Sequence, residues 1–181
     1  VLGATGSIGR STLEVIRRHG DRFRPAVLTA RRSARELDEL ALEFDPDFVV
    51  LAEEPEDGFR PEWSGQWRYG ADMVAEAAAV PGVEVVVNGL VGVAGLEPTI
   101  RALRGGRRLA LANKESLVAG GELVLEARSS GGGEMIPVDS EHSAIHQCLA
   151  GRSARDVRRI LLTASGGPFR ETPADSFDRI R

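Results

Sequence analysis

The sequence contains a single cysteine, Cys148, which excludes an internal disulfide bond and a metal cluster held by several thiolates. No apolar run is long enough to span a bilayer, so we expect no membrane segment. The formal net charge of −4 gives no general attraction to nucleic acid or to an acidic membrane surface. These absences favour a globular, cytoplasmic protein that acts on small molecules.

Lysine is also scarce, because Lys114 is the one lysine among 23 basic residues. A lysine kept under such a bias is expected to do something that arginine cannot, such as presenting a compact ammonium group in a tight site. The alternative is that a single lysine remains by chance. The 181 residues, 42% of them hydrophobic, suffice for one packed domain and part of another, and both ends of the sequence look cut.

Strand-like and helix-like patterns alternate over the first 138 residues. Strands are predicted at 1–2, 25–30, 48–51, 83–87, 108–112 and 134–138. Helices are predicted from the end of the glycine segment at residue 9 to about 19, and at 34–44, 72–80, 96–103 and 117–128, with an irregular connection at 53–69. This alternation predicts an α/β fold with a doubly wound, Rossmann-like parallel sheet.

Three glycines, Gly3, Gly6 and Gly9, lie between the first strand and the first helix. Glycines let the backbone turn tightly and approach a pyrophosphate, and the free N–H groups of a helix start attract the anion. Thr5 and Ser7 add hydroxyl groups. The strand before and the helix after the pattern favour dinucleotide binding over a merely structural turn.

The end of the second strand distinguishes between cofactors. An NAD site usually has an acid there for the ribose hydroxyls, whereas this chain has Arg31, Arg32 and Ser33. Two guanidinium groups and a hydroxyl suit a 2′-phosphate, so the sequence favours NADP over NAD. The alternative is that one or both arginines point into water, as most surface arginines do.

A second polar group follows the fifth and sixth strands. Asp139 and Glu141 lie two residues apart at the end of an apolar run, which predicts a buried strand, and hard carboxylate oxygens there suit Mg²⁺ or Mn²⁺. The alternative is that Asp139 or Ser140 caps a helix and Glu141 is a first-turn acid. Asn113, Lys114 and Glu115 follow the fifth strand in the same way.

Three remaining residue types have simpler interpretations. His142 and His146 are four residues apart, as in some zinc pairs, but no glutamate follows the first histidine, so we expect structural histidines. Cys148 is expected to be a small core residue. Trp63 and Trp67 are expected to pack a loop.

Four motifs in one order give the chain a resemblance to a known family. GATGSIG at 3–9, LANKESLV at 111–118, PVDSEHSA at 137–144 and TASGGPF at 163–169 resemble 1-deoxy-D-xylulose 5-phosphate reductoisomerases. The resemblance implies an NADPH-dependent rearrangement and reduction of 1-deoxy-D-xylulose 5-phosphate to 2-C-methyl-D-erythritol 4-phosphate, in the non-mevalonate isoprenoid pathway. It further implies that residues 1–138 bind NADPH and that 139–181 start an α+β catalytic domain.

The resemblance also implies roles for individual residues. NADPH would contact Thr5, Gly6, Ser7, Ile8, Arg31, Arg32, Ser33, Asn113 and Glu115. Lys114, Asp139 and Glu141 would be catalytic, with Asp139 and Glu141 as metal ligands. The sugar phosphate substrate would contact Lys114, Ser140, Glu141 and Ser165.

One departure from the family pattern is Arg31, where the family usually has glycine, and this leaves the local backbone shape open. The family's third metal carboxylate, its tryptophan-bearing lid and further phosphate ligands would lie beyond Arg181. We therefore expect the chain to be inactive alone. The full-length protein is expected to be a homodimer. Alternatives are a non-catalytic NADPH-binding module and another NADP-linked oxidoreductase.

Overall fold

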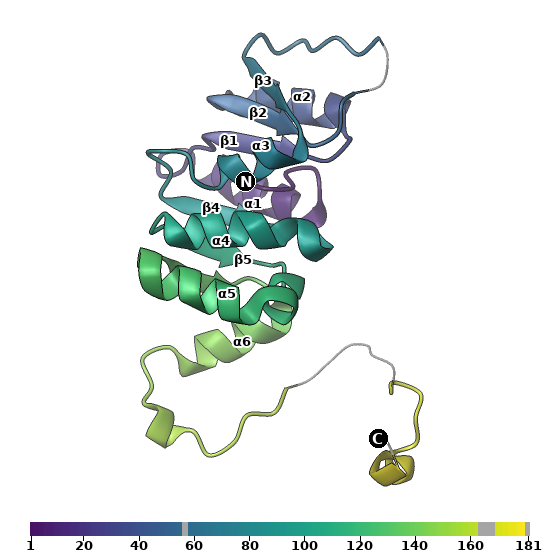
Figure 1. Ribbon diagram of the computed structural model, residues 1–181, viewed down its shortest axis with the longest axis vertical. Helices are drawn as coiled ribbons and strands as arrows, with labels where there is room; N and C mark the ends of the chain where they lie inside the picture. The colour runs from purple at the N-terminus through teal and green to yellow at the C-terminus, as the bar shows by residue number, and fades with distance from the viewer. Residues whose placement is uncertain (56–57, 163–168, 180–181) are drawn as a thin grey trace. The chain divides into compact units, whose positions relative to one another are not determined.

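The computed structural model describes residues 1–55, 58–162 and 169–179 (Figure 1). The chain divides into two compact units, Val1–Asp139 and Ser140–Arg181. The first unit contains every strand of the described residues. It therefore contains the sheet on which the predicted cofactor site depends.

The first unit has two three-stranded parallel sheets, and the amino-terminal residues join them. The strands are β1 (Val27–Ala30), β2 (Phe48–Leu51), β3 (Gln66–Tyr69), β4 (Val85–Asn88), β5 (Arg108–Leu111) and β6 (Glu134–Pro137). The N–H of Thr29 donates to the carbonyl of Val1, and the N–H of Leu2 donates to the carbonyl of Val87. The strand order is therefore β3-β2-β1, the amino-terminal segment, then β4-β5-β6.

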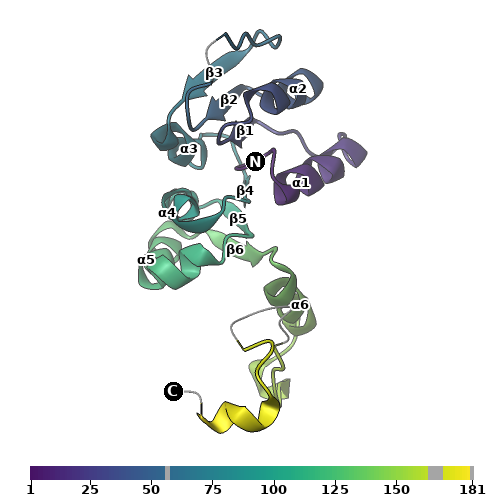
Figure 2. The ribbon, with the colours of Figure 1, turned by 90° about the vertical axis from the view of Figure 1, so that its right-hand side faces the viewer.

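Helices cover both faces of this sheet. They are α1 (Ser7–Arg18), α2 (Ala34–Phe44), α3 (Ala71–Ala77), α4 (Leu96–Arg104) and α5 (Glu115–Gly131). Figure 2 shows α1 and α2 on one face and α3, α4 and α5 on the other. The predicted doubly wound parallel sheet is confirmed.

Alternate residues of the central strands supply two separate cores, because successive side chains of a strand point to opposite faces. On β2, Phe48 and Val50 pack into the core with α3, α4 and α5, whereas Val49 and Leu51 pack into the core with α1 and α2. Three of these four are completely buried and Phe48 is nearly so. Each contributes roughly 1.5–3 kcal/mol by burial, so β2 anchors both layers.

The two outer strands differ from the sequence prediction. Residues 53–69 were expected to be an irregular connection, but Gln66–Tyr69 forms β3 and pairs in parallel with β2. The prediction is wrong because an edge strand has no continuous buried run, and these side chains are exposed or half-buried. β6, expected to be buried, is half-buried for the same reason.

The second unit contains α6 (Ser140–Leu149) and two short 3₁₀ helices, η2 (Ala154–Asp156) and η3 (Ala174–Arg179). No residue of α6 is buried. The prediction that Cys148 is a core residue is wrong, because its side chain is exposed. His142 and His146 are exposed as well. Within the described ranges, no helix is both long and apolar enough to cross a membrane.

Candidate functional site

The predicted site residues of the first unit follow the carboxyl ends of parallel strands. Thr5 follows the amino-terminal segment, Arg31 follows β1, Asn113 follows β5 and Asp139 follows β6. Because every strand pair in the two sheets is parallel, these ends lie along one edge of the sheet. This is the edge at which open α/β sheets bind ligands.

The glycine loop turns tightly and lies directly against α1. Gly3 has a φ of +80°, a conformation that residues with a Cβ rarely adopt. A Cβ on Gly9 would lie 2.2 Å from the carbonyl oxygen of Gly3, so only glycine lets α1 approach the loop this closely. The first turn of α1 therefore starts beside the loop, as phosphate binding requires.

Within the part of the chain that the structure describes, the first turn of α1 carries no acidic side chain that could compete with a bound anion. Gly6 occupies the N-cap position and makes no side-chain cap. Thr5 is half-buried, Gly6 and Ser7 are exposed, and Ile8 is half-buried. The free backbone N–H groups and the positive end of the helix dipole together make this end suitable for a pyrophosphate.

Asn113 is buried and holds the segment that follows β4. Its Nδ2 donates to the carbonyl oxygens of Leu90 (2.6 Å) and Gly92 (2.8 Å), and its Oδ1 accepts from the backbone N–H of Ser116 (2.8 Å). A predicted cofactor residue thus also shapes the rim of the site. Asn88, which sequence reasoning missed, extends this network by donating to the carbonyl oxygen of Gly95 at 2.9 Å.

Arg31 and Arg32 share one carboxylate, that of Glu53. The Nε of Arg31 donates to Oε1 of Glu53 at 2.6 Å, and the Nε of Arg32 donates to Oε2. These bonds, with Arg32 contributing most, hold the pKa of the Glu53 carboxyl below its usual value. Arg31 does not have positive φ, so glycine is not required at this position. Ser33 is the N-cap residue of α2 and makes no side-chain cap.

Lys114 and Asp139 form an ion pair at the ends of neighbouring strands β5 and β6. The Nζ of Lys114 donates to Oδ2 of Asp139 at 2.7 Å. The Asp139 side chain is only 12% exposed, whereas that of Lys114 is 53% exposed. A largely buried carboxylate is therefore neutralised by a cation that solvent can reach. Glu115, the first residue of α5, is exposed.

The other predicted metal and substrate residues belong to the second unit. Ser140 and Glu141 are the first two residues of α6; Ser140 is exposed and Glu141 is half-buried. Ser165 lies outside the described residues. Over the described ranges, no group of three or more histidine, cysteine or acidic side chains is arranged to hold a metal ion, and this includes a zinc site built on His142.

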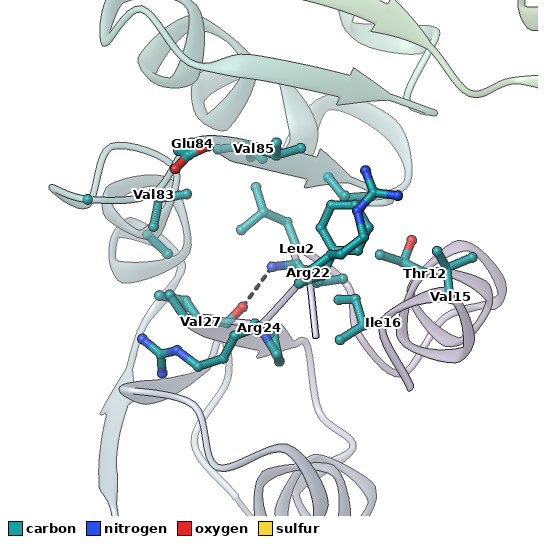
Figure 3. A pocket seen from close by; sticks show the side chains of 18 residues that line it. Leu2, Thr12, Val15, Ile16, Arg22, Arg24, Val27, Val83, Glu84 and Val85 are labelled. Carbon is teal, nitrogen blue, oxygen red and sulfur yellow. Dashed lines mark hydrogen bonds between the residues drawn. The ribbon is translucent and has the colours of Figure 1, made fainter. Parts of the chain in front are cut away.

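A cavity of about 450 Å³ lies at the opposite, amino-terminal edge of the strands, beside Val1 (Figure 3). Its walls carry Leu2, Ile16, Val27 and Val85, and none of the predicted site residues lines it. The backbone nitrogen of Val1 donates to the carbonyl oxygen of Val27 at 2.7 Å. The cavity is therefore separate from the candidate site.

Comparisons with known proteins identify a single family. A family model for 1-deoxy-D-xylulose 5-phosphate reductoisomerase matches residues 1–121, and a model for the C-terminal domain of the same enzyme matches residues 135–181. The reductoisomerase of Chlorobaculum tepidum is 45% identical over 99% of this chain, which covers 48% of that protein. The reductoisomerase of Dechloromonas aromatica is 47% identical over 96% of the chain, which covers 46% of that protein.

Solved structures give the same result. A reductoisomerase from Zymomonas mobilis in complex with NADPH has a TM-score of 0.81 and is 41% identical in sequence. The match covers 95% of this chain and 46% of the Zymomonas chain. A reductoisomerase in complex with magnesium has a TM-score of 0.82 and is 34% identical in sequence. The match covers 98% of this chain and 48% of the magnesium-bound chain. The chain spans about half the length of the curated relatives it matches. It belongs to the 1-deoxy-D-xylulose 5-phosphate reductoisomerase family.

Proposed function

We propose that this chain is the NADPH-binding part, and the start of the catalytic part, of a 1-deoxy-D-xylulose 5-phosphate reductoisomerase. Residues 1–138 would bind NADPH, and residues 139–181 would begin the metal- and substrate-binding domain. The observation that carries the proposal is the common edge of the sheet, which gathers the glycine loop, the arginine pair and the Lys114–Asp139 ion pair. Family membership supports the same assignment.

NADPH fits the first unit. The loop between Gly3 and Gly9 leaves no room for a Cβ at Gly9, and the helix that follows has an uncapped amino end. Thr5, Gly6, Ser7 and Ile8 would hold the pyrophosphate there. Arg31, Arg32 and Ser33 would hold the 2′-phosphate, while Asn113 and Glu115 would contact the cofactor from the end of β5.

A divalent metal fits the chemistry of Asp139 and Glu141. Both are hard oxygen donors, and Asp139 already pairs with a cation, the Lys114 ammonium. When bound, the metal polarises the substrate's oxygens and NADPH supplies a hydride. Lys114 would bind a substrate oxygen once Asp139 has another positive partner. Ser140, Glu141 and Ser165 would hold the sugar phosphate.

Two expectations about the whole protein stay predictions, namely a homodimer and a cytoplasmic location.

A second candidate function is favoured by one observation, which is that the chain covers only about half of each relative. Without the rest of the catalytic domain, the 181-residue chain would bind NADPH and perform no chemistry. The chain alone would then behave as a non-catalytic NADPH-binding module.

The proposal is tested with two proteins, the 181-residue chain and the full-length protein that contains it. NADPH and NADH are titrated into each, and turnover of 1-deoxy-D-xylulose 5-phosphate is measured with Mg²⁺ or Mn²⁺. We expect both proteins to prefer NADPH and only the full-length protein to turn over. Absence of NADPH binding by both, or full-length protein that binds NADPH but leaves the substrate unchanged, would contradict the proposal.

A further inference from the structure

Glu53 lies two residues after the end of β2, and Arg31 and Arg32 directly follow the end of its parallel neighbour β1. Its backbone N–H donates to the carbonyl oxygen of Arg31 at 3.0 Å, so the end of β2 is tied to the end of β1. Its side chain is 37% exposed, whereas those of Arg31 and Arg32 are 73% and 70% exposed. A fixed, partly covered carboxylate therefore lies between two cationic side chains that are otherwise in solvent.

The carboxylate uses one edge of each guanidinium group. Both of its oxygens accept from an Nε atom, and across the described residues no Nη atom of Arg31 or Arg32 makes a hydrogen bond. A guanidinium group has five N–H donors, of which four are on the Nη atoms. Both arginines thus keep most of their donors for another anion, and the three side chains together keep a charge of 2 − 1 = +1.

We propose that Glu53 is a positioning residue that holds Arg31 and Arg32 ready for the 2′-phosphate of NADPH and so raises selectivity for NADPH over NADH. This inference rests on the proposed function. A free arginine side chain has many rotamers, and ordering it on binding lowers affinity. Glu53 orders both arginines before the cofactor arrives.

The opposite effect, repulsion between Glu53 and the phosphate, is weaker in this geometry. The carboxylate is flanked by two positive charges and accepts from the Nε atoms, so the Nη atoms can still donate to a phosphate. Solvent exposure further screens the negative charge. The pKa of the Glu53 carboxyl is lowered by Arg32 and Arg31, so the carboxylate is charged at neutral pH and the arrangement persists there.

The test compares 2′,5′-ADP with 5′-AMP, two ligands that differ by the 2′-phosphate alone. Dissociation constants are measured by calorimetry on the 181-residue chain for the wild type, Glu53→Ala, Glu53→Gln and Glu54→Ala. Glu54 is the matched control, because it is the next residue, carries the same charge, is exposed and forms no ion pair among the described residues.

We expect Glu53→Ala to weaken 2′,5′-ADP about 5-fold and 5′-AMP less than about 2-fold, with Glu53→Gln in the same direction. Glu54→Ala should leave the ratio of the two affinities unchanged. Tighter binding of 2′,5′-ADP by either Glu53 variant would show competition instead of positioning and would overturn the inference, as would an unchanged ratio. If neither the wild-type chain nor the full-length protein that contains it binds 2′,5′-ADP or NADPH, the proposed function is refuted, and the inference with it.

Discussion

Lys114 and Asp139 are 25 residues apart in the sequence and 2.7 Å apart in space, from Nζ to Oδ2. The register of β5 against β6 brings them together, because Leu111 pairs with Pro137 and the two side chains follow these residues. The acid that is proposed to bind a metal is thus held by the chain's one lysine. The pair provides the most direct tests of the catalytic half of the proposal.

Asp139→Asn should abolish turnover and spare the cofactor. The amide keeps the size of the side chain but loses the charge that attracts both Lys114 and a divalent metal. In the full-length protein we expect turnover to fall by more than about 100-fold, with NADPH affinity within about 2-fold of the wild type. Metal affinity, measured by calorimetry with Mn²⁺, should fall in parallel. Turnover near the wild-type value would remove Asp139 from the metal site.

Lys114→Arg tests whether the site needs an ammonium group or only a positive charge. Guanidinium is larger, planar and more weakly hydrated, so it should pair with Asp139 but fit a substrate oxygen poorly. We expect kcat/KM of the full-length protein to fall about 10-fold or more, with unchanged NADPH affinity. Arg104→Lys, the reverse exchange on the exposed end of α4, is the control and should have no effect. Full activity of Lys114→Arg would show that charge alone suffices.

Gly9→Ala should damage the cofactor loop, because the new Cβ would lie 2.2 Å from the carbonyl oxygen of Gly3. Overpacking of this kind costs about 1–3 kcal/mol, and moving α1 away from the loop would also weaken NADPH binding. Urea unfolding and NADPH titration of the 181-residue chain measure the two effects. Gly121→Ala in α5 is the matched control, since a Cβ there meets nothing within 4 Å and alanine favours a helix. Equal stability of the two variants would contradict the close approach.

The sequence predicted most of the central sheet because its strands have strong local signals. The four residues of β2 are all buried and were found as an apolar run, and α2 has the predicted bounds. β3 was missed because Gln66 and Tyr69 are exposed and the pairing with β2 is a long-range contact that no local pattern encodes. Cys148 was placed in a core because its residue type is usually buried, but no residue of α6 is buried.

In the candidate site, too, features with a local sequence pattern were predicted, whereas contacts between distant parts of the chain were not. The glycine spacing and the positions after strand ends were enough to predict that Gly9, Arg31, Lys114 and Asp139 follow the carboxyl ends of the strands. The partner of the two arginines was not found, because Glu53 lies 21 residues from Arg32 and becomes its neighbour only through the pairing of β1 with β2. Asn113 was predicted as a cofactor residue, whereas its bonds to the carbonyls of Leu90 and Gly92 appear only in three dimensions.

Acid should weaken the link between α1 and α2, which depends on Arg17. The Nε of Arg17 donates to Oε1 of Glu43 at 2.5 Å, and this bond lowers the pKa of the Glu43 carboxyl below 4.5. Because the pKa of Glu43 is lower in the folded state, the ion pair stabilises the fold fully above the unfolded pKa of 4.5, and this stabilisation is lost as the pH falls through the folded pKa.

Arg17→Met removes the partner of Glu43, so we expect the variant to unfold at a lower urea concentration than the wild type at neutral pH and to approach the wild type in acid. The effect should be small, because the pair is exposed. Urea midpoints measured across this pH range, with Arg104→Lys as the control, check the expectation, and a difference that persists in acid would show that Arg17 acts by packing on Phe44 instead.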